Sequence, residues 1–118
     1  MPFLDPEDHL ERPLDLHERL VRRPAATFLL RARGDGLVDA RVHDGDLLVV
    51  DRSVEAADGD VVVAVADGGL VIRQLRQLGG GWVLESSGPG RPRLVVDPEA
   101  GVQVWGVVTA SITEHCRR

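Results

Sequence analysis

The 118-residue chain has one cysteine, Cys116, and no run of about 18 or more apolar residues. A single cysteine excludes an intramolecular disulfide, and the missing apolar run excludes a membrane-spanning helix. The acidic N-terminus, residues 1–8, lacks the positively charged region of a signal peptide. Together these absences predict a cytoplasmic protein that has no membrane partner.

Lysine and tyrosine are also absent, aromatic residues make up 3% of the chain, and the formal net charge is −5. Direct binding to nucleic acid depends on clustered basic residues and, for single strands, on aromatic side chains that stack with bases. The only adjacent basic pairs are Arg22-Arg23 and Arg117-Arg118. We therefore expect no direct nucleic-acid binding, and any role on DNA would depend on a protein partner.

The chain contains residue types that can bind metal ions, but their spacing does not match a metal site. The triplets Asp44–Asp46 and Asp58–Asp60 stand directly before hydrophobic segments, and the EF-hand pattern is absent. The four histidines are scattered, and no second cysteine accompanies Cys116. The sequence predicts turns at the two triplets, surface positions for the histidines, and neither a metal nor a cofactor.

The composition divides the chain into two regions. Residues 1–14, with three prolines and many charges, predict an extended N-terminal arm, whereas residues 15–118 predict one domain. Asp15 with Glu18 three residues later forms a capping-box pattern, which predicts a short helix over residues 15–22 that Pro24 ends.

The remainder alternates segments rich in Val and Leu with glycine turns, and Asp67-Gly68-Gly69 is short enough to close a hairpin. Strands are expected at residues 27–32, 46–51, 60–66, 70–78, 82–85, 93–96 and 102–112. No long helical segments alternate with these strands. The pattern therefore predicts a mostly β fold, a sandwich or a barrel, rather than a parallel α/β sheet.

Four segments are specific in their order and spacing. They are Gly34-Asp35-Gly36-Leu37, Asp44-Gly45-Asp46-Leu47-Leu48, Val71-Ile72-Arg73-Gln74-Leu75 and Val104-Trp105-Gly106-Val107-Val108. In this arrangement the chain resembles the UmuD/LexA family of self-cleaving serine–lysine peptidases, and most closely the processed form of UmuD. The resemblance implies a single compact β domain of the LexA/UmuD C-terminal type, which forms a homodimer. It also begins near residues 3–8, where the processed form begins, which suggests a chain made without a segment to be cleaved.

In that family a Gly-Asp-Ser-Met segment supplies the nucleophile and a Val-Lys-x-Leu strand supplies the base. The resemblance places Gly36 at the serine position and Arg73 at the lysine position. Glycine has no nucleophile, and arginine cannot become a neutral base because its pKa stays above about 12. Since the chain has no lysine elsewhere, the expectation is a degenerate peptidase that is not an enzyme.

A buried Arg73 would need an acidic partner, because an unpaired buried cation is costly. Asp35 and Asp39, which flank Gly36, are the candidate partners. Plain structural roles remain the alternative: Gly36 as a turn residue and Arg73 as a strand residue whose charge reaches water.

The resemblance implies a non-catalytic accessory protein that partners an error-prone Y-family DNA polymerase, and a recombinase filament, in SOS-response translesion synthesis. The alternative is a regulatory pseudo-peptidase that pairs with an active LexA- or UmuD-type protein. A rearranged hydrolase would have to use one of the serines Ser53, Ser86, Ser87 or Ser111. Candidate partner contacts, with core or dimer packing as the alternative, are Phe3, Leu4, Leu10 and the strands around Trp105.

Overall fold

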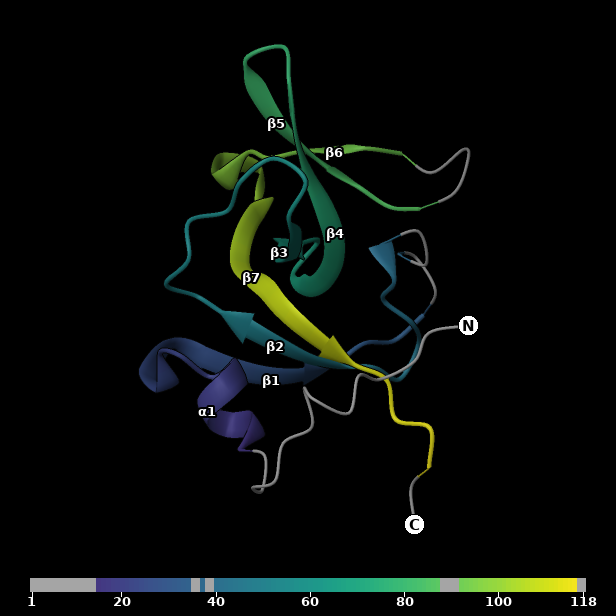
Figure 1. Ribbon diagram of the computed structural model, residues 1–118. Helices are drawn as coiled ribbons and strands as arrows, with labels where there is room; N and C mark the ends of the chain where they lie inside the picture. Colours follow the sequence, from purple (N-terminus) through teal and green to yellow (C-terminus); the bar gives the residue numbers. More distant parts are fainter. Residues whose placement is uncertain (1–14, 35–36, 38–39, 88–91, 117–118) are drawn as a thin grey trace.

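The computed structural model describes residues 15–34, 37, 40–87 and 92–116 (Figure 1). The expected arm, residues 1–14, lies outside these described residues, as do Asp35, Gly36 and Asp39. The described part contains a short α-helix, α1, two 3₁₀ turns, η2 and η4, and seven strands. Their bounds are α1 Leu16–Leu20, η2 Pro24–Ala26, β1 Thr27–Arg31, β2 Leu47–Asp51, β3 Val61–Ala66, β4 Gly69–Leu78, β5 Gly81–Glu85, β6 Leu94–Val95, η4 Pro98–Ala100 and β7 Gln103–Ile112.

The seven strands form one continuous sheet in the order β1-β2-β7-β3-β4-β5-β6, and every neighbouring pair is antiparallel. The sheet curls, so that it resembles the expected barrel more than a sandwich of two sheets (Figure 1). The prediction of a mostly β domain with one short helix is confirmed. In the described part of the chain, no helix is long and apolar enough to cross a membrane.

The helix α1 begins as its capping pattern predicts. The Asp15 carboxylate accepts a hydrogen bond from the Glu18 N–H at 3.1 Å. The helix ends at Leu20 with Val21 as its C-cap, two residues short of the expected end at residue 22, because η2 follows at Pro24. Proline disfavours helical backbone in the preceding residue, and Arg23 has an extended φ of −132°.

Two hairpins project from the sheet through two-residue turns. Ala66 pairs with Gly69 across Asp67 and Gly68, whose φ values are 51° and 77°. Leu78 pairs with Gly81 across Gly79 and Gly80, which also have positive φ. Positive φ at both central positions is typical of the type I′ turn, whose twist matches that of the strands.

The central strand β7 carries two β-bulges. Its register against β2 shifts at Val49/Val50, which leaves Thr109 as the extra residue. Its register against β3 shifts at Val63/Ala64, which leaves Trp105 as the extra residue. Bulges bend a strand and increase its twist, so these two positions account for the curl of the sheet around β7.

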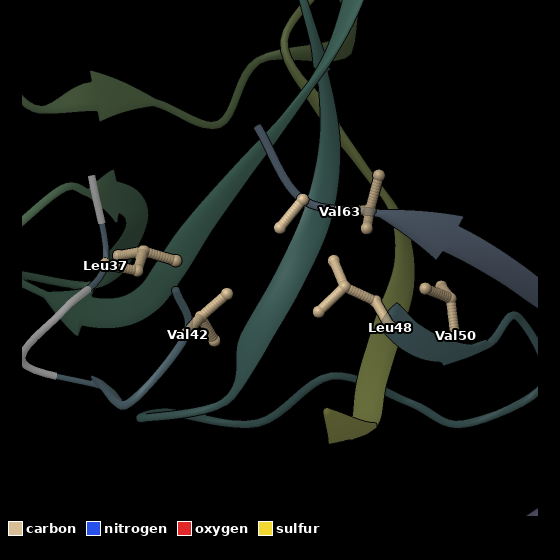
Figure 2. Close-up of a cluster of buried hydrophobic side chains, with 6 residues drawn as sticks. Leu37, Val42, Leu48, Val50 and Val63 are labelled. Atoms are coloured by element: carbon tan, nitrogen blue, oxygen red, sulfur yellow. The ribbon is translucent and has the colours of Figure 1, made fainter. Parts of the chain in front are cut away.

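Apolar side chains cover both faces of the curled sheet. One cluster contains Ala32, Leu37, Val42, Leu48, Val50 and Val63, five of which are labelled in Figure 2. The other contains Val62, Ala64, Leu75, Leu84 and Val107. Because successive side chains of a strand point to opposite faces, β3 contributes Val63 to the first cluster and Val62 to the second.

Two buried carboxylates, just before β2 and at its end, bond to residues distant in the sequence. Asp46 accepts hydrogen bonds from the Thr113 hydroxyl at 2.6 Å and from the His43 N–H at 2.9 Å. Asp51 accepts from the Ser53 hydroxyl and N–H at 2.6 and 2.8 Å, and forms an ion pair of 3.2 Å with Arg23. The hydrogen bond from Thr113 is the main cause that lowers the pKa of Asp46, and the hydroxyl of Ser53 is the main cause for the pKa of Asp51.

Candidate functional site

A pocket of about 340 Å³ lies between the segment that follows β1 and the first half of β4. Its floor is made by side chains of the first apolar cluster, Leu37, Val42, Leu48 and Val63. Figure 2 shows these four side chains as members of that cluster. The pocket therefore borders the first apolar cluster.

The described residues on either side of Gly36 lie at this pocket. Gly36 itself is outside the described residues, but Gly34 and Leu37, on either side of it, both line the pocket. Arg73 lines it from β4. Gly34 and Leu37 are thus brought to one pocket with Arg73, although 35 or more residues separate them from it along the chain.

Hydrogen bonds fix residues 32–34, which follow β1, against residues 44–46. The Ala32 N–H donates to the Asp46 carbonyl at 2.8 Å, and the Gly45 N–H donates to the Ala32 carbonyl at 2.9 Å. Beyond them, the Asp44 carboxylate accepts from the Gly34 N–H at 2.8 Å. The predicted turn at the Asp-Gly-Asp triplet 44–46 is confirmed, and the structure shows in addition that this turn anchors residues 32–34.

Arg73 is half-buried in β4, opposite Val62 of β3. Its Nη1 donates a hydrogen bond of 2.7 Å to the carbonyl of Ile72, so the guanidinium folds back onto its own strand. The predicted partners Asp35 and Asp39 lie outside the described residues, and their pairing with Arg73 stays a prediction.

The pocket is lined by two further arginines, Arg31 and Arg33, which the sequence analysis did not single out. No Asp or Glu is among the described residues that line it. Arg31 is held by a hydrogen bond of 2.8 Å from its Nη1 to the Gly45 carbonyl. Their spacing of two along one segment was the available signal, but only the fold shows that this segment borders the pocket.

The serines lie elsewhere. Ser53 is in the turn after β2, where its hydroxyl donates to Asp51. Ser86 and Ser87 follow β5, and Ser111 lies in β7. None of the four is among the residues that line the pocket.

The other side chains considered as metal ligands either accept hydrogen bonds from backbone N–H groups or lie far from one another. Asp58 accepts from the Gln77 N–H, and Asp60 from the Ala57 N–H, which confirms the turn at the second triplet. Within the described ranges, no three His, Cys, Asp or Glu residues gather in a group that could hold a metal ion. The three described histidines are exposed, as is Cys116.

Comparison with known proteins supports the resemblance. The sequence pattern of the Peptidase S24-like family matches residues 3–109. Protein MucA of Escherichia coli is 42% identical over 106 residues, which cover 89% of this chain and 72% of MucA. Protein SamA of Salmonella typhimurium is 43% identical over 105 residues, with the same two coverages. LexA repressor 2 of Pseudomonas putida is 34% identical over 99 residues, 80% of this chain and 49% of that protein. The predicted relationship to the UmuD/LexA group is thereby confirmed.

Proposed function

The chain belongs to the Peptidase S24-like family, and from that membership we propose that it is a non-catalytic accessory protein of SOS mutagenesis. Its similarity to MucA and SamA over about nine-tenths of its length supports a role related to SOS mutagenesis. The finer proposal is a dimer, similar to processed UmuD, that assembles with an error-prone Y-family polymerase.

The observation that carries the non-catalytic part is the identity of residue 73. A serine–lysine peptidase needs an amine that can be neutral beside the attacking hydroxyl. Burial can make a lysine neutral, but the guanidinium of arginine stays charged in any protein environment. Arg73 lies at the pocket, and the chain contains no lysine that could replace it.

The pocket composition supports the same proposal. No serine is among its described lining residues, and the hydroxyl of Ser53 is committed to the buried Asp51. The net charge of −5 favours contact with a protein over contact with DNA. A polymerase that itself binds DNA would supply the nucleic-acid contact.

Two measurements on the purified chain test this proposal. We expect no cleavage of a peptide that carries the cleavage segment of an active family member, under conditions in which that member cleaves it. We also expect a Y-family polymerase to co-purify with the tagged chain from DNA-damaged cells, because the proposed role belongs to the SOS response.

The results separate the alternatives. Turnover by the unmodified chain would refute the non-catalytic role, and its loss on Ser53→Ala, Ser86→Ala, Ser87→Ala or Ser111→Ala would identify a rearranged hydrolase. Recovery of an intact LexA- or UmuD-type protein in place of a polymerase would favour the regulatory pseudo-peptidase. A matched control is the same capture from undamaged cells.

A further inference from the structure

A pocket of about 310 Å³, which we call the α1 pocket, lies between α1 and the sheet. One wall is formed by the end of α1 and the segment after it, and the other by β7 and the end of β2. The α1 pocket and the pocket that contains Arg73 have no described lining residue in common. A volume of this size is at the lower end for small-molecule sites, so the α1 pocket has room for a compact ligand.

Three arginines line the α1 pocket. Arg19 lies in the last turn of α1, and Arg22 and Arg23 follow the helix as one of the two adjacent basic pairs in the sequence. Asp51 is the one acidic residue among the described residues that line this pocket. Arginines therefore outnumber carboxylates here, although the whole chain has a net charge of −5. A pocket with such an excess of positive charge attracts anions.

The carboxylate of Asp51 is already engaged. Asp51 is 4% exposed, accepts two hydrogen bonds from Ser53, and pairs with Arg23 at 3.2 Å. The side chain of Arg23 nevertheless remains 57% exposed. Because arginine has five N–H donors, Arg23 can keep this ion pair and still donate to a ligand. Asp51 thus fixes the position of one guanidinium and leaves the charges of the other two arginines unbalanced.

Arg19 and Arg22 are exposed and have donors available. Neither has a side-chain hydrogen bond or an ion pair with another residue in the part of the chain that the structure describes. By contrast, Arg31 in the other pocket donates to the Gly45 carbonyl at 2.8 Å. Two positive charges at one pocket repel each other, and an anion between them offsets this repulsion. The two arginines therefore favour a ligand of negative charge.

We propose that the α1 pocket binds a compact anion with two or more phosphate groups, a binding activity beyond the proposed function. The guanidinium group matches phosphate oxygens in a bidentate geometry, and such charge-assisted hydrogen bonds are among the stronger ones. Asp51 balances one of the three arginine charges, so the remaining charge suits more than one phosphate group. Leu20, Val54 and Ala110 also line the pocket, and apolar walls concentrate the field of the arginines.

The number of acceptor oxygens favours phosphate over carboxylate. A terminal phosphate group has three acceptor oxygens, whereas a carboxylate has two. Because three arginines reach the pocket from different positions along the chain, the ligand must present oxygens in several directions. A diphosphate meets this requirement better than a dicarboxylate of similar size.

The test is isothermal titration calorimetry of the full chain with inorganic pyrophosphate, orthophosphate and malonate. We expect pyrophosphate to bind about tenfold tighter than either of the other two anions, the size of one charge-assisted hydrogen bond. Added sodium chloride is expected to weaken the binding, because dissolved ions screen exposed charges.

A nucleoside diphosphate distinguishes the two sources of such phosphate groups. Binding at least as tight as that of pyrophosphate would indicate a nucleotide as the ligand. Much weaker binding would indicate a free polyphosphate.

Variants assign the binding to the α1 pocket. Arg19→Gln and Arg22→Gln are each expected to weaken pyrophosphate binding about tenfold, because each removes one charge-assisted contact. Arg41→Gln is the matched control, since Arg41 is exposed and lines neither pocket, and it is expected to keep the affinity of the parent chain. Arg23 is left unchanged, because its ion pair with the buried Asp51 contributes to the fold. Circular dichroism and size-exclusion chromatography check that each variant keeps the fold and the oligomeric state of the parent chain.

Absence of pyrophosphate binding, or equal affinity for pyrophosphate and either of the other anions, would overturn the inference. An affinity that the folded variants Arg19→Gln and Arg22→Gln both retain would also overturn it. A loss of affinity on Arg33→Gln alone would place the anion in the pocket of Arg73 and would likewise refute the assignment. None of these outcomes depends on peptide cleavage, so the inference and the non-catalytic role fail separately.

Discussion

Gly106 lies in β7 at a point where two strands approach closely. A Cβ at this position would lie 2.7 Å from Val50 Cγ1 and 3.3 Å from Arg52 Cγ. Val50 is fully buried and is packed in the first apolar cluster, so it has no space into which to move. Glycine is required here for lack of space rather than for a turn.

Gly106→Ala is expected to lower the free energy of unfolding by about 1–3 kcal/mol, the usual cost of overpacking a core. Urea denaturation followed by tryptophan fluorescence measures this loss. The matched control is Gly106→Ala combined with Val50→Ala, which removes the blocking methyl group. The combined loss should be smaller than the sum of the two single losses, and strict additivity would contradict the steric explanation.

The chemistry at residue 73 could be predicted from the sequence because it depends on residue type alone. A guanidinium does not lose its proton in any fold, so the identity of Arg73 settles whether it can act as a neutral base. That Arg31 and Arg33 line the pocket could not be predicted in this way. Their position depends on where the segment after β1 lies, which is a property of the folded sheet.

Turns and strands are the elements that local sequence specifies best. The strand segments expected from the Val- and Leu-rich pattern are present in the structure, because alternating burial and glycine turns are local requirements. The main difference between the expected and observed strands is the length of β6. This strand contains only Leu94 and Val95, whereas a strand over residues 93–96 is expected from the sequence. It lies at the edge of the sheet, where only one neighbour supports pairing.

The turn of the β3–β4 hairpin depends on the backbone conformation of Gly68. Gly68 has a φ of +77° and nothing within 4 Å of the position of its Cβ, so only backbone conformation constrains it. Gly68→Ala is expected to cost about 1 kcal/mol, because a side chain disfavours the left-handed conformation. Urea denaturation measures this cost.

The neighbouring Gly69 is the control for this prediction. It does not have a positive φ, and its Cβ would be 4.0 Å from the Ala66 carbonyl oxygen. Gly69→Ala should therefore have little effect on stability. A loss from Gly69→Ala equal to that from Gly68→Ala would show that the cost does not arise from the turn conformation.

At the scale of the whole molecule, two carboxylates connect segments far apart in the chain. Asp46, just before β2, bonds to Thr113 beyond β7, and Asp51 at the end of β2 pairs with Arg23 before β1. Both have a pKa below the ordinary value of 3.8, mainly through the hydroxyls of Thr113 and Ser53 respectively. Their charged forms therefore stabilise the folded chain.

A carboxyl with a lower pKa in the folded state contributes stability that is complete above its unfolded pKa and is lost as pH falls through the folded pKa. We expect the free energy of unfolding to be level with respect to these two groups above about pH 5 and to decline below about pH 4. Urea denaturation at a series of pH values measures this decline.

Asp46→Asn and Asp51→Asn should each lower stability at pH 7 and make the decline below pH 4 shallower, because one titrating carboxylate is removed. Asp67→Asn, at an exposed turn, is the control. If all three variants show the same acid dependence as the parent chain, the buried carboxylates are not responsible for it.

The sequence by itself determined which residue types are present and where the chain turns. Absence of lysine is a property of residue type, and positive φ at Gly68 or Gly80 is a requirement within a few residues. The tertiary structure decided that β7 inserts between β2 and β3, with bulges at Thr109 and Trp105. It also brought Gly34 and Leu37 to the pocket shared with Arg73. Such pairings join segments distant along the chain, so they are selected by packing across the whole core rather than by any local pattern.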